Sequence, residues 1–209
     1  MPPFDHAKNN GNVTKTASRV TTLVKQAQAG DKGAFEQLAN GFYKGIFHMV
    51  FYRTRNRMDA EDITQDIFTS AFNNLSKLQN VERFRAWLFR IGINRVRDFY
   101  RKKKIRSIFS FSIDKDEIEI LDTIDGEPPN AVDNLMKQEF WGHVDWLLKK
   151  LSRMEREVFL LRFMDHLTIK EISQVLRRSE SAVKTHLYRA LKKFKNDAEL
   201  INFLREDIL

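Results

Sequence analysis

The chain has 209 residues, enough for two small helical domains that each bury a modest core. Its 8 glycines and 4 prolines are few, which favours long helices over turn-rich β structure, so we expect an all-α fold. The net charge of +8 suits a polyanionic partner, although a surface charged for solubility explains it equally well. The absence of cysteine excludes disulfides and cysteine-liganded metal centres, and no apolar run approaches the ~20 residues of a membrane span. These features predict a soluble, cytoplasmic protein.

Helical periodicity organises the first half of the chain. Residues 1–15 lack it and are expected to form a disordered tail, whereas residues 16–78 predict three helices, with breaks at residues 30–31 and 53–59. The third helix is predicted to begin with Asp59 as N-cap and Asp62 at its third position, where carboxylates satisfy free amides. Its core-facing side is predicted to comprise Ile63, Ile67, Phe68, Ala71, Phe72 and Leu75.

An acidic segment divides the chain. A fourth helix is predicted before it, over residues 82–104, and the acidic residues 105–129 are interpreted as a flexible interdomain linker. The two expected domains are therefore residues 16–104 and 130–209. In the second domain an amphipathic helix is expected to end near Leu151. Two capping boxes then predict short helices, one with Ser152 and Glu155 and one with Thr168 and Glu171.

No pattern in the chain predicts catalysis. The 5 histidines are scattered without the spacing of a metal site, and no phosphate-binding glycine loop or nucleophile elbow occurs. We therefore expect a protein that is not an enzyme and needs no metal or cofactor.

The fourth helix separates into an apolar face and a cationic one. The cationic stripe sets one aromatic side chain among arginines and contains no carboxylate, a combination typical of single-strand binding, although a solvated charged face is the plain alternative. The stripe consists of Arg83, Trp87, Arg90, Asn94, Arg97, Arg101 and Lys104.

Residues 168–194 predict a helix-turn-helix, whose second helix packs through Val183, Leu187, Ala190 and Phe194. Its outward residues, Ser181, Lys184, Thr185 and Tyr188, are of types that contact a DNA groove. A helical hairpin without a DNA partner is the alternative. It is disfavoured by a basic end made of Arg189, Lys192, Lys193 and Lys195.

Three ordered blocks of the sequence resemble bacterial sigma factors of the sigma-70 family. Residues 59–68 (DAEDITQDIF) are similar to the family's polymerase-binding helix, and residues 84–94 (FRAWLFRIGIN) to its promoter-melting segment. Residues 151–190 resemble the fourth region of the family. Because the family's other middle domain is missing, the chain most resembles the small extracytoplasmic-function group.

The resemblance implies that the protein directs RNA polymerase to promoters without a cofactor. It implies core polymerase, through the β′ clamp and the β subunit, promoter DNA and an anti-sigma protein as partners. Polymerase binding is expected from Asp62, Gln65, Asp66, Thr69 and Asn73. Minus-ten DNA binding is expected from Gln79, Asn80, Arg83, Trp87, Arg90, Asn94, Arg97 and Arg101. Minus-thirty-five binding is expected from Arg178, Ser179, Ser181, Lys184, Thr185, His186, Tyr188 and Arg189.

The chain departs from the family at three positions. Family members often carry glycine where this chain has Arg177 and Ser181, and a basic residue where it has His186. If the turn requires a positive φ, Arg177 carries a strain of about 1–2 kcal/mol. Two rival functions stay open at this point: a stand-alone helix-turn-helix regulator, and a DNA enzyme such as a recombinase, for which no catalytic cluster is found.

Overall fold

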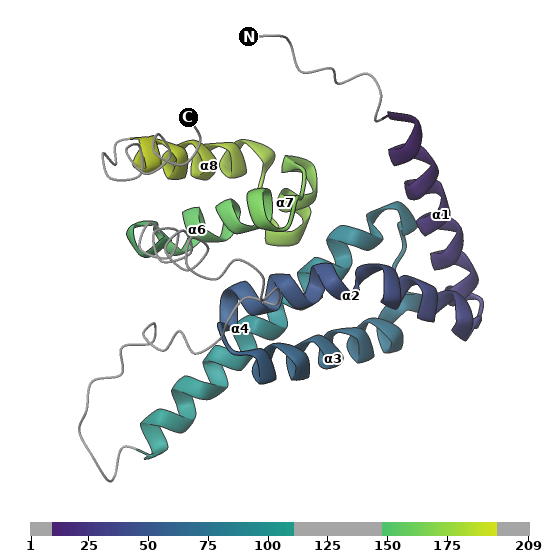
Figure 1. The fold of residues 1–209 in the computed structure, drawn as a ribbon, viewed down its shortest axis with the longest axis horizontal. Coiled ribbons are helices and arrows are strands. Elements are labelled where there is room, and N and C mark those ends of the chain that lie inside the picture. The colour runs from purple at the N-terminus through teal and green to yellow at the C-terminus, as the bar shows by residue number, and fades with distance from the viewer. Residues whose placement is uncertain (1–9, 111–147, 196–209) are drawn as a thin grey trace, which may run out of the picture. The chain divides into compact units, whose positions relative to one another are not determined.

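The computed structural model describes residues 10–110 and 148–195, and every regular element within these ranges is a helix (Figure 1). The predicted all-α fold class is therefore confirmed. The chain divides into two compact units, Met1–Asp122 and Thr123–Leu209, and the division falls within the segment interpreted as a linker. None of the helices in the described ranges is long and apolar enough to cross a membrane.

The first unit is a bundle built around one central helix. Its elements are α1 (Asn10–Gln28), α2 (Lys32–Thr54), α3 (Arg57–Asn74), the 3-10 turns η1 (Leu75–Lys77) and η2 (Val81–Arg83), and α4 (Phe84–Ser110). Helix α2 packs against α1, α3 and α4, which are labelled in Figure 1. Helix α1 also contacts η1 and η2. The largest fully buried side chains of this unit are Leu38, Ile46, Met49, Phe51, Ile67, Phe84, Leu88 and Ile93.

The break between α1 and α2 lies at the predicted glycine. Gly30 has a φ of 100°, and the amides of Gly30 and Asp31 donate to the carbonyls of Ala27 and Gln26. This is the Schellman ending, which requires a left-handed residue and is easiest with glycine. Asp31 then caps α2 by accepting from the Ala34 amide at 3.0 Å, so the same residue completes the ending of α1 and begins the next helix.

Several predicted helix ends are wrong. Asn56, not Asp59, is the N-cap of α3, since its side chain accepts from the Asp59 amide at 3.0 Å and Arg55 before it turns the chain with a φ of 56°. Helix α1 starts at Asn10, within the predicted tail, and α4 continues to Ser110, within the predicted linker. Helix formation propagates along any stretch without a breaker residue, so these ends carry little signal in the apolar pattern.

Phe72 corrects the predicted core face of α3. Its side chain is 49% exposed, whereas Ile63, Ile67, Ala71 and Leu75 are buried. The ring meets Phe35 in an edge contact at 5.1 Å, which covers only one of its sides. Phe72 is therefore an exposed aromatic side chain at the end of α3.

Gly92 allows α4 to lie close to α2. A Cβ atom added at Gly92 would stand 2.2 Å from the Met49 Cε atom and 3.5 Å from the Ile67 Cδ1 atom. Met49 is fully buried, so a larger residue at Gly92 would force the end of its side chain to move.

The second unit contains the predicted helix-turn-helix. Its elements are α6 (Arg153–Phe159), the π-helical turn η3 (Leu160–Met164), α7 (Ile169–Leu176) and α8 (Glu180–Lys195). Both predicted capping boxes are present, at Ser152 and at Thr168. The π-helical turn was not predicted; in it the Asp165 amide donates to the Leu160 carbonyl. Residues buried in this unit include Leu148, Leu151, Val158, Leu161, Leu167, Ile172, Val175, Val183 and Ala190.

An ion pair between a buried carboxylate and an exposed lysine ties α6 to α8. The Lys193 ammonium lies 2.7 Å from the Glu155 carboxylate, whose side chain is only 7% exposed. Phe159 stacks on Phe194 beside it, with ring centroids 4.6 Å apart. The interaction joins the start of one helix to the end of the other.

Candidate nucleic-acid interface

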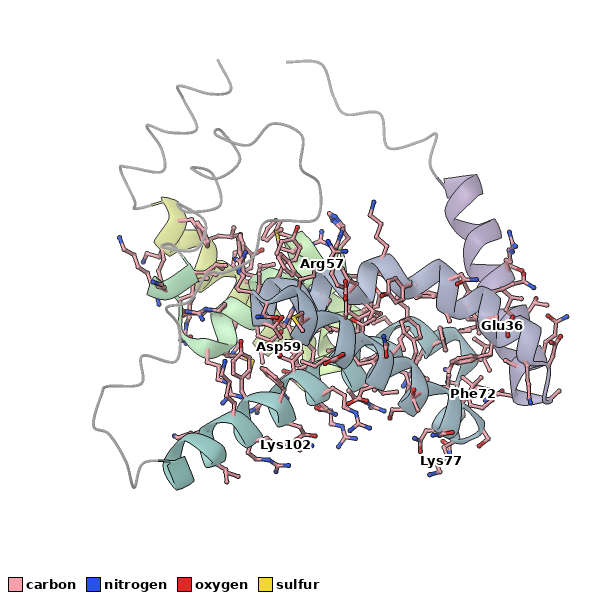
Figure 2. All side chains as sticks on the ribbon, turned by 60° about the horizontal axis from the view of Figure 1, so that its bottom comes forward. Glu36, Arg57, Asp59, Phe72, Lys77 and Lys102 are labelled. Atoms are coloured by element: carbon pink, nitrogen blue, oxygen red, sulfur yellow. The ribbon has the colours of Figure 1, made fainter. Side chains whose placement is uncertain are left out.

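The polar stripe predicted on α3 faces solvent. All five of its members, Asp62, Gln65, Asp66, Thr69 and Asn73, are exposed. None of them forms a hydrogen bond or ion pair with other side chains in the described ranges, so the two carboxylates and the amides are available to a partner. The stripe begins one turn after Asp59, near one end of α3 in Figure 2, and runs toward Phe72 at the other.

Exposed apolar side chains border this stripe, and the sequence pattern missed them as candidate site residues. Phe72 is 49% exposed and Tyr43 of α2 is 44% exposed, with its ring stacked on Phe68 at 6.1 Å. Figure 2 shows Phe72 on the same side as Glu36 at the start of α2. A gathering of exposed aromatics marks an interaction surface. The sequence did contain a signal for these exposed residues: α2 carries more aromatic residues than one face of a helix can bury, so some of them must face solvent.

The cationic stripe of α4 is largely accessible, as predicted. Arg97, Arg101 and Lys104 are exposed, while Trp87 and Arg90 are half-buried. The Trp87 ring lies 5.9 Å from the buried Phe84 ring, so part of the indole packs and part remains available for stacking. The remaining exposed members are Arg83 and Asn94.

A carboxylate that the sequence interpretation did not consider lies beside the stripe. Asp98 lies one turn before Arg101 and pairs with it at 3.1 Å, with both side chains largely in solvent. Exposed pairs of this kind contribute little. Lys102, labelled in Figure 2, and Lys103 are exposed beside the stripe, so the helix remains strongly cationic.

The segment between η1 and α4 projects Gln79 and Asn80 into solvent. The Asn80 side-chain oxygen accepts from the Glu82 amide at 3.0 Å, which caps η2 and leaves the amide nitrogen pointing away from that bond. Leu78 before this segment and Phe84 after it are buried. The chain therefore presents a short polar tip held between two anchors.

Helix α8 presents a polar outer face above a buried inner one. Val183 and Ala190 are buried against α6 and α7, and Tyr188 on the outer side is 70% exposed. The other exposed residues of the predicted reading face are Arg178, Ser179, Ser181, Lys184, Thr185 and Arg189.

Several residues of this face have structural roles that the sequence did not predict. The Ser179 hydroxyl accepts from the Ala182 amide at 3.2 Å and caps α8. The Thr185 hydroxyl donates to the Ser181 carbonyl at 2.9 Å. His186 is half-buried, with its Nδ1 atom enclosed and without a hydrogen bond in the described ranges. Lys193 is held by Glu155, so it is not available as a basic contact.

Side chains that could bind a metal do not gather in the described ranges: no group of three histidine, aspartate or glutamate residues is suitably placed there. The accessible features are instead a polar and aromatic surface on α2 and α3, a cationic surface on α4 with the polar tip before it, and a polar and basic face on α8.

Two family models match the chain in the same order as these surfaces. The model of Sigma-70 region 2 matches residues 38–105, and the model of Sigma-70, region 4 matches residues 144–194. Together they cover more than half of the chain.

Individual relatives agree with the family models. The chain is 28% identical to the ECF RNA polymerase sigma factor SigW of Bacillus subtilis, covering 83% of this chain and 95% of SigW. It is 27% identical to the ECF RNA polymerase sigma factor BldN of Streptomyces coelicolor, covering 84% of this chain but only 64% of BldN. The solved structure of CnrH in complex with the cytosolic domain of CnrY matches with a TM-score of 0.62 at 26% identity, over 90% of this chain and 99% of that one.

Proposed function

This chain belongs to the sigma-70 family of RNA polymerase sigma factors, in its extracytoplasmic-function group, and we propose that it binds core polymerase and directs promoter-specific initiation. The observation that carries the proposal is the presence of both family regions, each in its own unit and each with an accessible surface of the appropriate chemistry. Such a factor recognises a promoter and positions the polymerase on it, and it catalyses no reaction of its own. We therefore assign it no catalytic reaction and place it in the bacterial cytoplasm.

Polymerase docking is assigned to the exposed side of α3. Asp62, Gln65 and Asp66 supply polar groups for the β′ clamp, and Phe72 and Tyr43 add apolar area beside them. A protein interface commonly combines an aromatic centre with a polar rim, and this surface has both.

A second apolar surface lies on the second unit. Phe163 is 41% exposed and Leu191 is 37% exposed, with Phe163 packed on Phe159 at 4.7 Å. We assign these exposed apolar side chains to contact with the β subunit, since neither of them belongs to the duplex-reading face of α8.

Capture of the minus-ten strand is assigned to α4 and the tip before it. Arginines along α4 neutralise phosphates, and the exposed part of Trp87 offers a base-stacking surface worth about 1–3 kcal/mol. Gln79 and Asn80 at the tip carry amides that can hydrogen-bond an unstacked base.

Reading of the minus-thirty-five duplex is assigned to the outer face of α8. Ser181, Lys184 and Tyr188 point outward from its first half, where a recognition helix enters the major groove. Arg178 and Arg189 flank them as phosphate contacts.

Regulation by an anti-sigma protein is the remaining part of the proposal. The solved relative CnrH is in complex with the cytosolic domain of CnrY. This chain leaves the α3 stripe and the α4 cations exposed, so a regulatory partner that covers either surface would keep it from polymerase or DNA. The stand-alone regulator is disfavoured because it would give the region 2 unit no role.

Run-off transcription tests the function directly. Purified core polymerase is combined with the full chain on a pool of bacterial promoter fragments, and the RNA ends are sequenced. We expect RNA starting at a fixed distance from shared minus-ten and minus-thirty-five sequences, only when both proteins are present. Specific binding of the chain alone to a duplex operator, without any start site under polymerase, would instead support the stand-alone regulator.

A further inference from the structure

We infer that Gln28 of α1 is a positioning residue for minus-ten recognition, because its side-chain amide holds the base of the tip that carries Gln79 and Asn80. This inference rests on the proposed function and adds to it a residue outside both surfaces that contact DNA. Gln28 touches no nucleic acid in this assignment and acts through the conformation of the backbone.

The contact is a double hydrogen bond to one short turn. The Gln28 Nε2 atom donates to the Leu75 carbonyl at 2.9 Å and to the Leu78 carbonyl at 2.8 Å. A primary amide has two N–H groups, so both donors are used. The two carbonyls enclose the turn η1, and the bonds span 47 and 50 positions of the sequence. One half-buried side chain of α1 thus fastens the backbone at the end of α3.

The backbone of Gln28 is itself fixed. It is the last residue of α1, and the Schellman ending at Gly30 closes the helix immediately after it. Asp31 then starts α2, which packs along α1. The direction of the Gln28 side chain is therefore set by the junction of two helices rather than by a flexible loop.

The tip is held at both ends as a result. Leu75 and Leu78 are buried, and Gln28 binds their carbonyls; at the other end Phe84 is buried and the Asn80 side chain caps η2. If a loop is already ordered before its ligand binds, binding does not have to include the free-energy cost of ordering that loop. Without the Gln28 amide, the Leu78 carbonyl would lose its bond to α1 and the Leu75 carbonyl would keep only its bond from the Leu78 amide, so the backbone leading into Gln79 would be less restrained.

The test measures base preference, which a purely structural role would not alter. Promoter pools with randomised minus-ten and minus-thirty-five positions are transcribed by core polymerase with each variant, and the RNA is sequenced. Gln28→Met keeps the length of the side chain and removes both donors. Gln26→Met is the matched control, since Gln26 lies exposed on the same helix two residues away and makes no side-chain hydrogen bond in the described ranges.

We expect Gln28→Met to weaken the preference for the best base at one or more minus-ten positions by about three- to tenfold. This is the change in an equilibrium constant that corresponds to the loss of one or two hydrogen bonds. Preference at the minus-thirty-five positions and affinity for core polymerase should stay unchanged, and Gln26→Met should match the unmodified chain. Lower thermal stability with unaltered minus-ten preference would overturn the inference.

Two further variants cover a failure of Gln28→Met to fold. Gln28→Glu keeps the size but turns both donors into acceptors, whereas Gln28→Lys keeps a donor that reaches carbonyls. The first should lose minus-ten preference and the second retain it, and equal preferences in the two would overturn the inference. If the unmodified chain yields no promoter-specific RNA, the proposed function fails, an outcome distinct from failure of the Gln28 assignment alone.

Discussion

At the residue scale, Glu155 is a buried carboxylate whose ionisation contributes to the stability of the second unit. Burial raises its pKa, but hydrogen bonds from Lys193 and Ser152 and the Lys193 charge outweigh this, so its pKa lies below the ordinary 4.5. A group whose folded-state pKa is depressed stabilises the fold above its unfolded pKa. That stabilisation is lost as the pH falls through the folded value.

We predict that Glu155→Gln lowers the free energy of unfolding at pH 7 by about 1 kcal/mol, the difference between a charge-assisted and a neutral hydrogen bond. Glutamine still completes the capping box, so the change isolates the charge. Because the carboxylate of the unmodified chain is protonated in acid, the difference should shrink as the pH falls through its lowered pKa in the folded state. Thermal unfolding followed by circular dichroism over a series of decreasing pH values measures it, and a difference that does not change with pH would contradict the role of the charge.

Arg177 departs from the family and stores strain, as the sequence indicated it would if the turn required a positive φ. It ends α7 with a φ of 52°, and its amide and that of Arg178 both donate to the Ser173 carbonyl. This is the glycine position of a left-handed helix ending, occupied by an arginine.

We predict that Arg177→Gly raises the free energy of unfolding by about 1 kcal/mol, since it removes the left-handed penalty of a residue with a Cβ atom. Arg178→Gly is the matched control and should give no gain, because Arg178 is not among the residues of positive φ. Denaturant titration of the full chain measures both variants. An equal gain from the two would mean that loss of charge, not of strain, is responsible.

At the element scale, periodicity and capping chemistry predicted most of the helices. They did not predict features that depend on tertiary contacts, such as the partner of Lys193. The helix-turn-helix and both capping boxes are local patterns, and they were predicted correctly. Asn56 and Asp59 are both good caps, and only the turn at Arg55 decides between them. The partner of Lys193 lies 38 positions away, so its removal from the basic face could not be predicted from spacing.

Gly92 of α4 lies against the side chain of Met49 in α2, and a second helical glycine provides the comparison. Gly45 of α2 has open space around an added Cβ atom, whereas Gly92 does not. Gly45→Ala should stabilise by about 1 kcal/mol through helix propensity. Gly92→Ala should be about 1–3 kcal/mol less stable than Gly45→Ala, because Met49 must move. Chemical denaturation of both variants measures the difference. Equal stability would show that the Met49 side chain moves aside without a cost in free energy.

Under the proposed function, helix α8 uses Lys184 and Arg189 for DNA, whereas Lys193 pairs with Glu155. Lys184→Ala and Arg189→Ala should each reduce the slope of log affinity against log salt for promoter duplex by about one unit. Lys193→Met should leave the slope unchanged, because its ammonium is engaged by Glu155. Fluorescence anisotropy over a range of salt measures all three variants. An equal change from all three would indicate a general charge effect instead of specific phosphate contacts.

At the scale of the whole molecule, the proposed function gives polymerase docking to the first unit and duplex reading to the second, so a mutation should remove one activity without the other. We predict that Asp62→Arg combined with Asp66→Arg lowers affinity for core polymerase at least about 100-fold, since reversed charges at an interface cost several kcal/mol. Helical content and duplex binding by the second unit should stay unchanged. A pull-down with core polymerase measures the loss, with Asp62→Asn and Asp66→Asn as the milder comparison, and unaltered affinity would remove α3 from the docking surface.

Helix α4 serves two environments along its length. Near its start, Gly92 lies against the fully buried Met49 side chain, whereas Arg97, Arg101 and Lys104 are exposed further along the same helix. At 1.5 Å per residue, Lys104 stands about 18 Å along the helix axis from Gly92. Under the proposed function, the buried part of α4 therefore holds the helix in the first unit, while its exposed part is left to contact promoter DNA.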